Sequence, residues 1–369
     1  MRCPGVELRP DWQSDASAPL GKDVGSWGYT SDARSIEAVP FLDHGAPRVS
    51  RTISCVKRIK IFYDSPGWAY HRKALSLQSH APADFATEIG PLRGREDLRE
   101  GLRTGPYDLV FVLPIHETEM VRAAVQGRGW ATKVVGSWNS GWPREGADFQ
   151  TAYEIVDAMI VNSRSAWENS GALPRAHYLP NGVDLEVFRV RVPPRRRAPK
   201  VLWVGSRHHR EVKGYELRIR PLRAELAAAG IECDFALVDS QAPPRNVEQM
   251  VQWYNEGTVF VCASHSEGTP NTALEAAACG CTLVSTPVGN MPELIRDEQN
   301  GYLVDGETPD LAGAVRRAIG NYPRLSRELQ RDIRSWSWRE ASEGFYALFR
   351  SVLGESPASG PSPAGGWRG

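Results

Sequence analysis

Short apolar runs alternate with helix-like stretches along most of this 369-residue chain. The runs of the first half span 57–63, 108–113, 133–137, 158–161 and 176–179, and those of the second half span 201–205, 234–238, 259–262, 282–285 and 301–304. Each run has the length of a buried strand. Because strands that alternate with helices form parallel sheets covered on both faces, the pattern predicts the α/β class.

The composition divides the chain into two folded units. Residues 1–55 and the tail 354–369 are rich in Gly, Pro and Ser and have little periodicity, so we expect a loosely ordered extension and a disordered tail. The segment 189–200, RVRVPPRRRAPK, is rich in proline and arginine, which is typical of a linker. We therefore expect one α/β domain over 56–192 and a second over 199–337.

Composition is that of a soluble enzyme with real cores, since 41% of the residues are hydrophobic and no run is long enough to span a membrane. The first residues show no secretory leader. None of the six cysteines forms a CxxC pair, and we expect reduced thiols. The predicted compartment is the cytoplasm, with peripheral contact to a membrane surface left open.

Charge is uneven although the net charge is zero. Residues 51–200 carry 22 basic and 16 acidic side chains, a net charge of +6. A basic first domain favours an anionic partner through long-range attraction, and ordinary solvated surface charge is the alternative.

The most informative segment is 264–294, SHSEGTPNTALEAAACGCTLVSTPVGNMPEL. Glu267 and Glu275 lie eight residues apart, one on each side of a Gly/Pro turn at the start of a predicted helix over 272–279. Free backbone N–H groups and the helix dipole favour a phosphate at such a turn. Ionised glutamates are pure acceptors and suit hydroxyl groups. Phosphate and hydroxyls together describe a nucleotide sugar.

This segment resembles the E-x7-E motif of the retaining family-4 glycosyltransferases, and the similarity extends over EGTPNTALEAAACGCTLVSTPVGNMPELI and NGYLV. The resemblance implies the GT-B fold, with two Rossmann-like parallel-sheet domains and a cleft between them. The first domain would bind the acceptor and the second would bind the nucleotide sugar. A terminal helix, 338–353, would return to the first domain, and Phe345, Leu348, Phe349 and Val352 have helical spacing there.

The resemblance also implies the donor-site residues of the second domain. Lys213, followed by Gly214, and Arg207 would hold the two phosphates, although the basic stretch GSRHHR leaves Arg210 as an alternative to Arg207. Glu275 would accept from the ribose hydroxyls and Glu267 from the sugar ring. The turn residues Gly268, Thr269, Pro270 and Asn271 would reach the sugar or phosphate, and Asn271 is expected to cap the helix.

In the first domain, the resemblance places Gly67 against the donor phosphate and His116 against the donor sugar. Trp68, Trp138 and Asn139 are the candidates for acceptor binding, and packing on the sheet is the alternative for Trp68. Ser163 is expected to cap a helix, and Gly182 is expected to occupy a strained backbone conformation in a tight turn.

The predicted function is a retaining hexosyl transfer from a UDP- or GDP-sugar to a hydroxyl by front-face substitution. No cofactor or metal is expected, because no Asp-x-Asp or His/Cys cluster demands one. The catalytic residues would be Glu267, Lys213, Arg207 and His116. The acceptor is open among an anionic glycan, a lipid phosphate, a nucleic acid base and a natural product. A binding module without turnover, or a transferase acting on a modified nucleic acid base, is the alternative.

Overall fold

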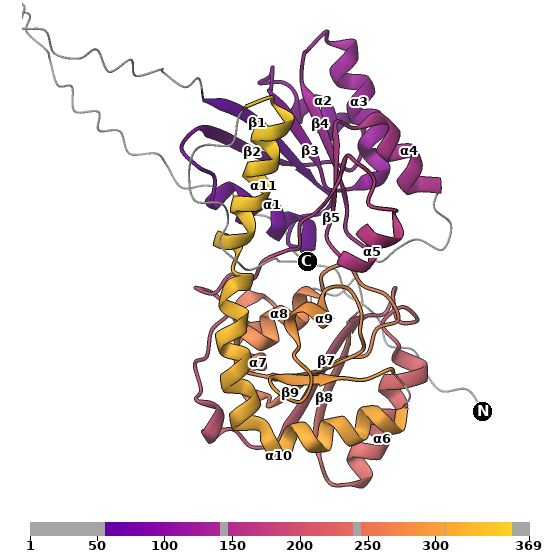
Figure 1. The fold of residues 1–369 in the computed structure, drawn as a ribbon, viewed down its shortest axis with the longest axis vertical. Coiled ribbons are helices and arrows are strands. Elements are labelled where there is room, and N and C mark those ends of the chain that lie inside the picture. The colour runs from indigo at the N-terminus through magenta and orange to yellow at the C-terminus, as the bar shows by residue number, and fades with distance from the viewer. Residues whose placement is uncertain (1–55, 141–146, 239–244, 307, 356–369) are drawn as a thin grey trace, which may run out of the picture. The chain divides into compact units, whose positions relative to one another are not determined.

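The computed structural model describes residues 56–140, 147–238, 245–306 and 308–355. The expected extension over 1–55 and nearly all of the expected tail lie outside these residues. Within them, two parallel sheets are each flanked by helices (Figure 1). The α/β class predicted from the alternation of strands and helices is therefore confirmed.

The first domain has a six-stranded parallel sheet in the order β2-β1-β3-β4-β5-β6. Its strands are β1 (Lys57–Tyr63), β2 (Phe85–Pro91), β3 (Leu109–Val112), β4 (Lys133–Trp138), β5 (Ala158–Val161) and β6 (Ala176–Tyr178). Its helices are α1 (Ala69–Ser79), α2 (Arg95–Gly101), the short 3-10 helix η1 (Ile115–Glu117), α3 (Thr118–Gly127), α4 (Ala147–Ile155) and α5 (Arg164–Asn169).

The second domain has a five-stranded parallel sheet in the order β11-β10-β9-β7-β8. Its strands are β7 (Lys200–Ser206), β8 (Glu232–Val238), β9 (Val259–Cys262), β10 (Thr282–Ser285) and β11 (Gly301–Leu303). Its helices are the π-helix η3 (Tyr215–Ile219), α6 (Arg220–Ala228), α7 (Val247–Glu256), α8 (Asn271–Ala278), α9 (Met291–Leu294) and α10 (Thr308–Asp332). A 3-10 turn η2 (Pro194–Arg196) lies in the linker.

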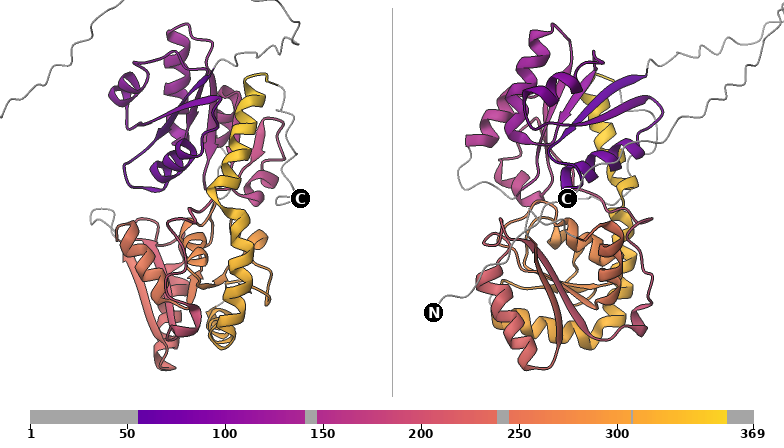
Figure 2. Two further views of the ribbon diagram at one scale, coloured as in Figure 1. Left: turned by 90° about the vertical axis from the view of Figure 1, so that its left-hand side faces the viewer. Right: turned by 180° about the vertical axis from the view of Figure 1, so that it is seen from behind.

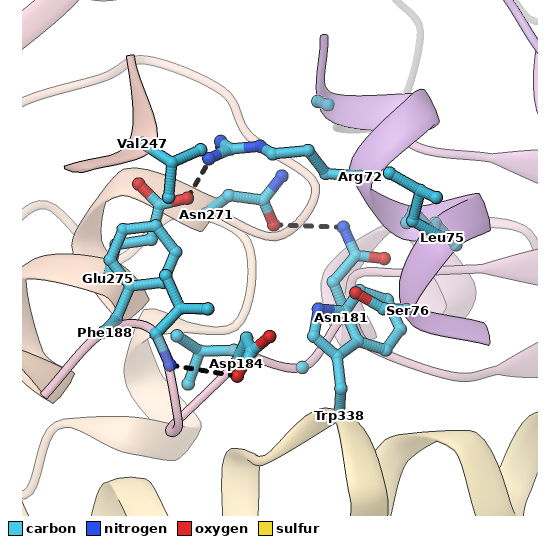
Figure 3. A pocket seen from close by; sticks show the side chains of 15 residues that line it. Arg72, Leu75, Ser76, Asn181, Asp184, Phe188, Val247, Asn271, Glu275 and Trp338 are labelled. Atoms are coloured by element: carbon cyan, nitrogen blue, oxygen red, sulfur yellow. Dashed lines mark hydrogen bonds and ion pairs between the residues drawn. The ribbon is translucent and has the colours of Figure 1, made fainter. Parts of the chain in front are cut away.

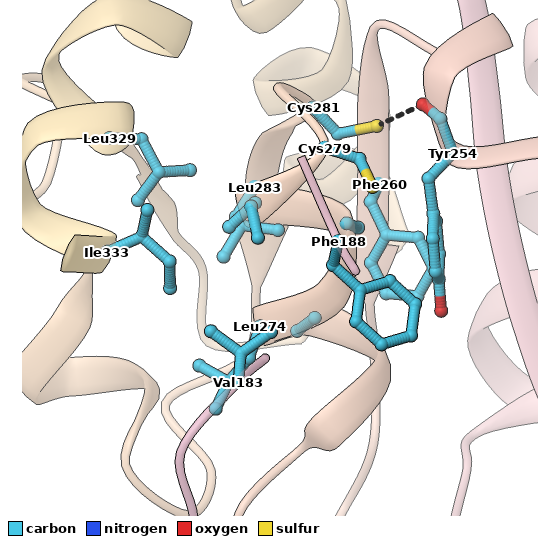
Figure 4. Packing of buried hydrophobic residues seen from close by; sticks show 14 of the residues in the cluster. Val183, Phe188, Tyr254, Phe260, Leu274, Cys279, Cys281, Leu283, Leu329 and Ile333 are labelled. Carbon is cyan, nitrogen blue, oxygen red and sulfur yellow. Dashed lines mark hydrogen bonds between the residues drawn. The ribbon is translucent and has the colours of Figure 1, made fainter. Parts of the chain in front are cut away.

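Each sheet carries a hydrophobic core on both faces. In the second domain, one core joins α7 and α8 to Val183 and Phe188, which belong to the segment between the two sheets (Figure 4). Cys279 and Cys281 are buried in this core as free thiols, as expected from the absence of a CxxC pair. The other core lies under α6 and α10.

The chain ends with a 3-10 turn η4 (Ile333–Trp336) and the helix α11 (Trp338–Val352). Phe345 and Phe349 of α11 are buried against Phe111 of β3, so this helix packs on the first domain beside α1 (Figure 2). Arg350 adds an ion pair to Asp84, with 2.8 Å between Nε and Oδ2. The returning helix implied by the resemblance is thus present.

Three local expectations differ from the structure. The sequence pattern missed β2, FATEIGP, because an edge strand that is only partly buried has weak apolar alternation and this one ends in Gly-Pro. Asn271 does not cap α8, because Pro270 occupies the N-cap position and Asn271 is the first helical residue. Gly182 does not have a positive φ. A Cβ there would lie 2.6 Å from the Trp338 amide nitrogen, so close backbone approach explains this glycine.

Ser163 behaves as predicted. Its hydroxyl accepts a hydrogen bond from the Ala166 amide at 3.2 Å and caps the start of α5.

Candidate donor and acceptor site

The turn after β9 places a lysine and a glutamate together. Glu267 Oε1 accepts hydrogen bonds from Lys213 Nζ at 2.5 Å and from the Ser264 hydroxyl at 2.6 Å. Burial alone would lower the pKa of Lys213, but the Glu267 carboxylate outweighs it and raises that pKa. The ammonium group is therefore held in its charged form beside the expected position of the donor diphosphate.

The glycine that follows Lys213 permits this approach. Gly214 has φ +69°, and a Cβ there would lie 2.3 Å from the Ala263 carbonyl oxygen. The loop after β7 therefore packs directly on the end of β9. Arg218 strengthens the contact, because its guanidinium donates to the carbonyl oxygens of Ala263 and Ser264 at 3.0 and 2.9 Å.

The next two residues of the turn contact the first domain. A Cβ on Gly268 would lie 2.3 Å from Asn162 Oδ1 and 2.5 Å from the Asn139 carbonyl oxygen, so only glycine fits. The Thr269 hydroxyl donates to the Asn162 carbonyl at 3.0 Å and accepts from the Asn181 amide at 3.1 Å. The turn that carries Glu267 is thus fixed between the two domains.

Glu275 lies one helical turn inside α8 and is almost fully buried. Its Oε2 accepts from the Tyr254 hydroxyl at 2.9 Å, and its Oε1 forms an ion pair with Arg72 of α1 at 2.8 Å (Figure 3). Burial raises the pKa of Glu275 above its usual value, while Arg72 and Tyr254 oppose that shift. Asn271, on the preceding turn, accepts from Asn181 Nδ2 at 3.1 Å.

A cavity of about 220 Å³ borders Glu275. Its lining comes from α1, the segment between the sheets, the starts of α7 and α8, and α11, and includes Arg72, Ser76, Asn181, Asp184, Val247 and Trp338 (Figure 3). Carboxylate, amide and guanidinium groups on an otherwise apolar wall suit a ligand with hydroxyl groups and a flat or apolar part.

Asn139 is the predicted acceptor residue that the fold brings into this region. Its Oδ1 accepts from Lys73 Nζ at 2.8 Å, and its carbonyl oxygen faces Gly268. Lys73 is only 2% exposed, and its ammonium group also lies 5.0 Å from the centre of the Phe345 ring. Burial lowers the pKa of Lys73 to about 7.

The other predicted residues of the first domain are not in the cavity. Gly67 has φ +81°, and its N–H donates to His71 Nδ1 at 2.9 Å in the turn after β1. Trp68 beside it is 45% exposed. The His116 side chain is also largely exposed, with Nε2 3.8 Å from Glu117 Oε1.

Trp138 is a correction to the acceptor prediction. It is buried and packs edge-on against Phe149 at 5.5 Å between ring centres. Side chains alternate along a strand, so Trp138 shares the face of Val134, and that face of β4 is covered by α4. The ring therefore packs in the core of the first domain.

Arg207 and Arg210 both lie in the turn after β7, and both are exposed. Within the described ranges, no group of three or more His, Cys, Asp or Glu is placed to hold a metal ion. None of the described helices is long and apolar enough to cross a membrane.

Sequence reasoning missed Arg72, Lys73, Asn162 and Asn181. The basic run His71-Arg72-Lys73 after the first turn was visible in the sequence, but its partners come from distant segments. No local pattern identifies such residues, since their role depends on which helix faces which loop.

Comparison with known proteins identifies the second domain. Residues 198–321 match the family model described as glycosyl transferases group 1. This range contains Lys213, Glu267 and Glu275, together with the turn that separates the two glutamates. Residues 198–321 therefore form a glycosyl transferases group 1 domain.

Two curated relatives with the same name each match more than half of this chain. A D-inositol 3-phosphate glycosyltransferase from Xylanimonas cellulosilytica is 26% identical over 249 residues, which cover 55% of this chain and 58% of the relative. A protein of the same name from Mycolicibacterium smegmatis is 31% identical over 253 residues, covering 58% and 57%. This chain therefore spans somewhat more than half the length of these two relatives.

Solved structures show that this chain has the GT-B fold. A sucrose-phosphate synthase from Thermosynechococcus elongatus superposes with a TM-score of 0.62 at 15% identity, over 81% of this chain and all of the other. The Anabaena protein HepE, solved in complex with UDP and glucose, superposes with a TM-score of 0.63 at 12% identity, over 80% of this chain and all of the other. The predicted fold is therefore confirmed.

The group 1 domain contains only part of the site. Arg207, Lys213, Glu267 and Glu275 lie inside the matched range, whereas Arg72 lies in the first domain outside it.

Proposed function

We propose that this chain is a retaining glycosyltransferase that moves a sugar from a UDP- or GDP-sugar to a hydroxyl group, without a metal ion. The observation that carries the proposal is the contact of Lys213 with Glu267 in the turn that opens α8, inside a group 1 glycosyltransferase domain. The curated relatives bear glycosyltransferase names, and HepE was solved with UDP-glucose, which supports a nucleotide sugar as the donor.

The second-domain residues have distinct roles in the proposed reaction. Lys213, together with Arg207 or Arg210, holds the diphosphate and stabilises the negative charge that develops on its departing oxygen. Glu267 accepts from hydroxyls of the transferred sugar. Glu275 accepts from the ribose hydroxyls of the nucleotide.

In the reaction, the acceptor oxygen forms a bond to the anomeric carbon on the same face from which the phosphate leaves. The bond between the anomeric carbon and the phosphate oxygen breaks, and its electron pair remains on the nucleoside diphosphate. The acceptor proton passes to that phosphate oxygen. Configuration at the anomeric carbon is thereby retained.

The acceptor is proposed to bind on the first domain and to carry negative charge, because the stretch 51–200 has a net charge of +6 from 22 basic and 16 acidic residues. Asn139 is the acceptor candidate that lies at the turn of the donor site. Exposed Trp68 and His116 remain candidates for the outer part of the site.

The first test is thermal unfolding with UDP, GDP, ADP and dTDP, using the wild type and the Lys213→Ala and Glu275→Ala variants. A nucleotide present at 100 times its dissociation constant should stabilise the wild type by about 2.7 kcal/mol. Both variants should lose this stabilisation. Arg220→Ala is the matched control, since Arg220 is exposed and pairs with Glu216 on the same helical surface.

Stabilisation by no nucleotide, or equal stabilisation of all variants, would contradict the proposed donor site. With the donor identified, the anomeric configuration of the product is measured by NMR. Inversion of an α-linked donor to a β-linked product would rule out the retaining reaction.

A further inference from the structure

Arg72 of the first domain contacts Glu275, the residue that is proposed to bind the ribose of the nucleotide. It lies on α1, and its guanidinium is 2.8 Å from Glu275 Oε1. The guanidinium is about one-third exposed, whereas the glutamate is buried, so the pair closes one side of the 220 Å³ cavity. This contact joins α1 of the first domain to α8 of the second domain.

The carboxylate of Glu275 keeps acceptor capacity for a ligand. Two oxygens offer about four lone-pair directions. Tyr254 and Arg72 use one direction on each oxygen. The remaining two suit the paired 2′- and 3′-hydroxyls of one ribose, and the glutamate lines the cavity where these would enter.

The surroundings of Glu275 make a cation necessary. The charged or titratable groups around it are Arg72 and Lys73 of α1, Tyr254 of α7, Asp184 of the segment between the sheets, and Cys279, the residue after α8. The Asp184 carboxylate accepts from the Glu186 and Val187 amides of its own loop. Arg72 makes the only direct ion pair with Glu275 among the described residues.

We propose that Arg72 is a donor-positioning residue: it orients the Glu275 carboxylate for the vicinal hydroxyls of a ribose and supplies the positive charge that this buried group needs. The inference rests on the proposed function, because it concerns the same nucleotide site. It adds that the site is complete only when α1 of the first domain contacts α8 of the second.

The pH dependence of binding has a definite sign. Burial already raises the pKa of Glu275, and Arg72 restrains that shift. Loss of Arg72 therefore raises this pKa further, so that Glu275 becomes neutral at a higher pH. A neutral carboxyl is a poorer acceptor for two hydroxyls. Nucleotide affinity should then fall most at mildly acidic pH.

The experiment measures the dissociation constant of UDP, or of the nucleoside diphosphate that stabilises the wild type, by calorimetry between about pH 5.5 and pH 8.5. The variants are Arg72→Met, Arg72→Lys and Glu275→Gln. Arg99→Met is the control, since Arg99 is an exposed arginine of α2. Each is also titrated with the 2′-deoxy nucleotide.

Arg72→Met should bind about tenfold more weakly than the wild type near pH 6, and the ratio should shrink toward pH 8.5. Arg72→Lys should recover part of the affinity. Glu275→Gln should bind weakly with no such change of ratio, and Arg99→Met should match the wild type. Only the wild type, Arg99→Met and Arg72→Lys should prefer the ribonucleotide over its 2′-deoxy form.

Tighter binding by Arg72→Met would overturn the inference, because it would mean that the ion pair blocks the ribose site. An affinity ratio that does not change with pH, or an intact ribose preference, would also overturn it. If Arg72→Met does not fold, Arg72→Lys and Glu275→Gln carry the same test. A wild type that binds no nucleoside diphosphate would instead refute the proposed function.

Discussion

Glu267 and Glu275 differ in where their cations come from. Glu267 pairs with Lys213, and both belong to the second domain. Glu275 pairs with Arg72, which belongs to the first. Both carboxylates are largely buried, with exposed side-chain fractions of 13% and 7%. One half of the site is therefore formed by a single domain, whereas the other half exists only when the domains meet.

The Lys213–Glu267 pair should therefore matter for the chemical step, whereas the Arg72–Glu275 pair depends on the contact between the two domains. The Lys213 contact can form as soon as the second domain folds, because its loops follow neighbouring strands of one sheet. The Arg72 contact depends on the packing of Gly268 and Thr269 against the first domain. It also depends on α11, which returns the end of the chain to the first domain. Substitutions in the two halves should thus change different measurements.

The largest expected effect is that of Lys213→Ala. Loss of a cation that stabilises the leaving phosphate should lower kcat by about 10²- to 10³-fold, which corresponds to about 3 to 4 kcal/mol. Steady-state kinetics with the identified donor measure it, with Arg220→Ala as the control. An unchanged kcat would place the charge stabilisation elsewhere, for example on Arg207 or Arg210.

Lys73→Met tests the buried amine that contacts Asn139 and the Phe345 ring of α11. The unfolded chain keeps Lys73 protonated up to about pH 10.5, whereas the folded protein releases that proton above about pH 7. Between these values the unfolded state binds more protons, so the wild type should gain stability as pH rises, by at most about 1.4 kcal/mol per unit from this group.

Lys73→Met should remove this contribution and be the more stable protein at about pH 7. Urea unfolding of both proteins at several pH values gives the difference, in which other titrating groups cancel. If the free energy of unfolding changed equally with pH in the two proteins, the ammonium group of Lys73 would not be desolvated by the fold.

Gly268→Ala should loosen the contact between the domains. The new Cβ would meet Asn162 and the Asn139 carbonyl at 2.3 and 2.5 Å, so we expect a loss of about 1 to 3 kcal/mol in unfolding free energy and weaker nucleotide binding. Gly320→Ala in α10 is the matched control, because its Cβ meets nothing within 4 Å. That helix should gain about 0.5 to 1 kcal/mol.

If Gly268→Ala were as stable as the wild type and bound the nucleotide equally well, the turn would have to move away from the first domain without a loss of unfolding free energy. The Arg72–Glu275 contact would then not depend on the packing of Gly268 against the first domain, and the distinction between the two glutamates would fail.

The smallest effect is expected from Tyr254→Phe. The lost hydrogen bond to Glu275 should weaken nucleotide binding by about three- to tenfold and leave kcat nearly unchanged. A kinetic titration of the donor measures both constants. A fall in kcat larger than the rise in KM would place Glu275 close to the chemical step, in contrast to its assigned role at the ribose.

The amino-acid pattern alone predicted ten of the strands, most of the helices and the turn that carries Glu267 and Glu275. Their signals are local: apolar runs of strand length, the Gly-Pro turn and the Ala-rich helix lie within short windows. The edge strand β2 escaped because only Phe85 and Gly90 of its seven residues are buried and it has no continuous apolar run. Ser163 was predictable as a cap because capping depends on neighbouring amides alone.

Only the tertiary structure decided which side chains face one another. The pleat of β4 directed Trp138 into the core, and Pro270 displaced Asn271 from the cap position. The partnership of Arg72 with Glu275 depends on two sheets and a returning helix. Such contacts leave no periodic trace in the sequence, because their geometry is set by packing between distant segments and not by the spacing of residues along the chain.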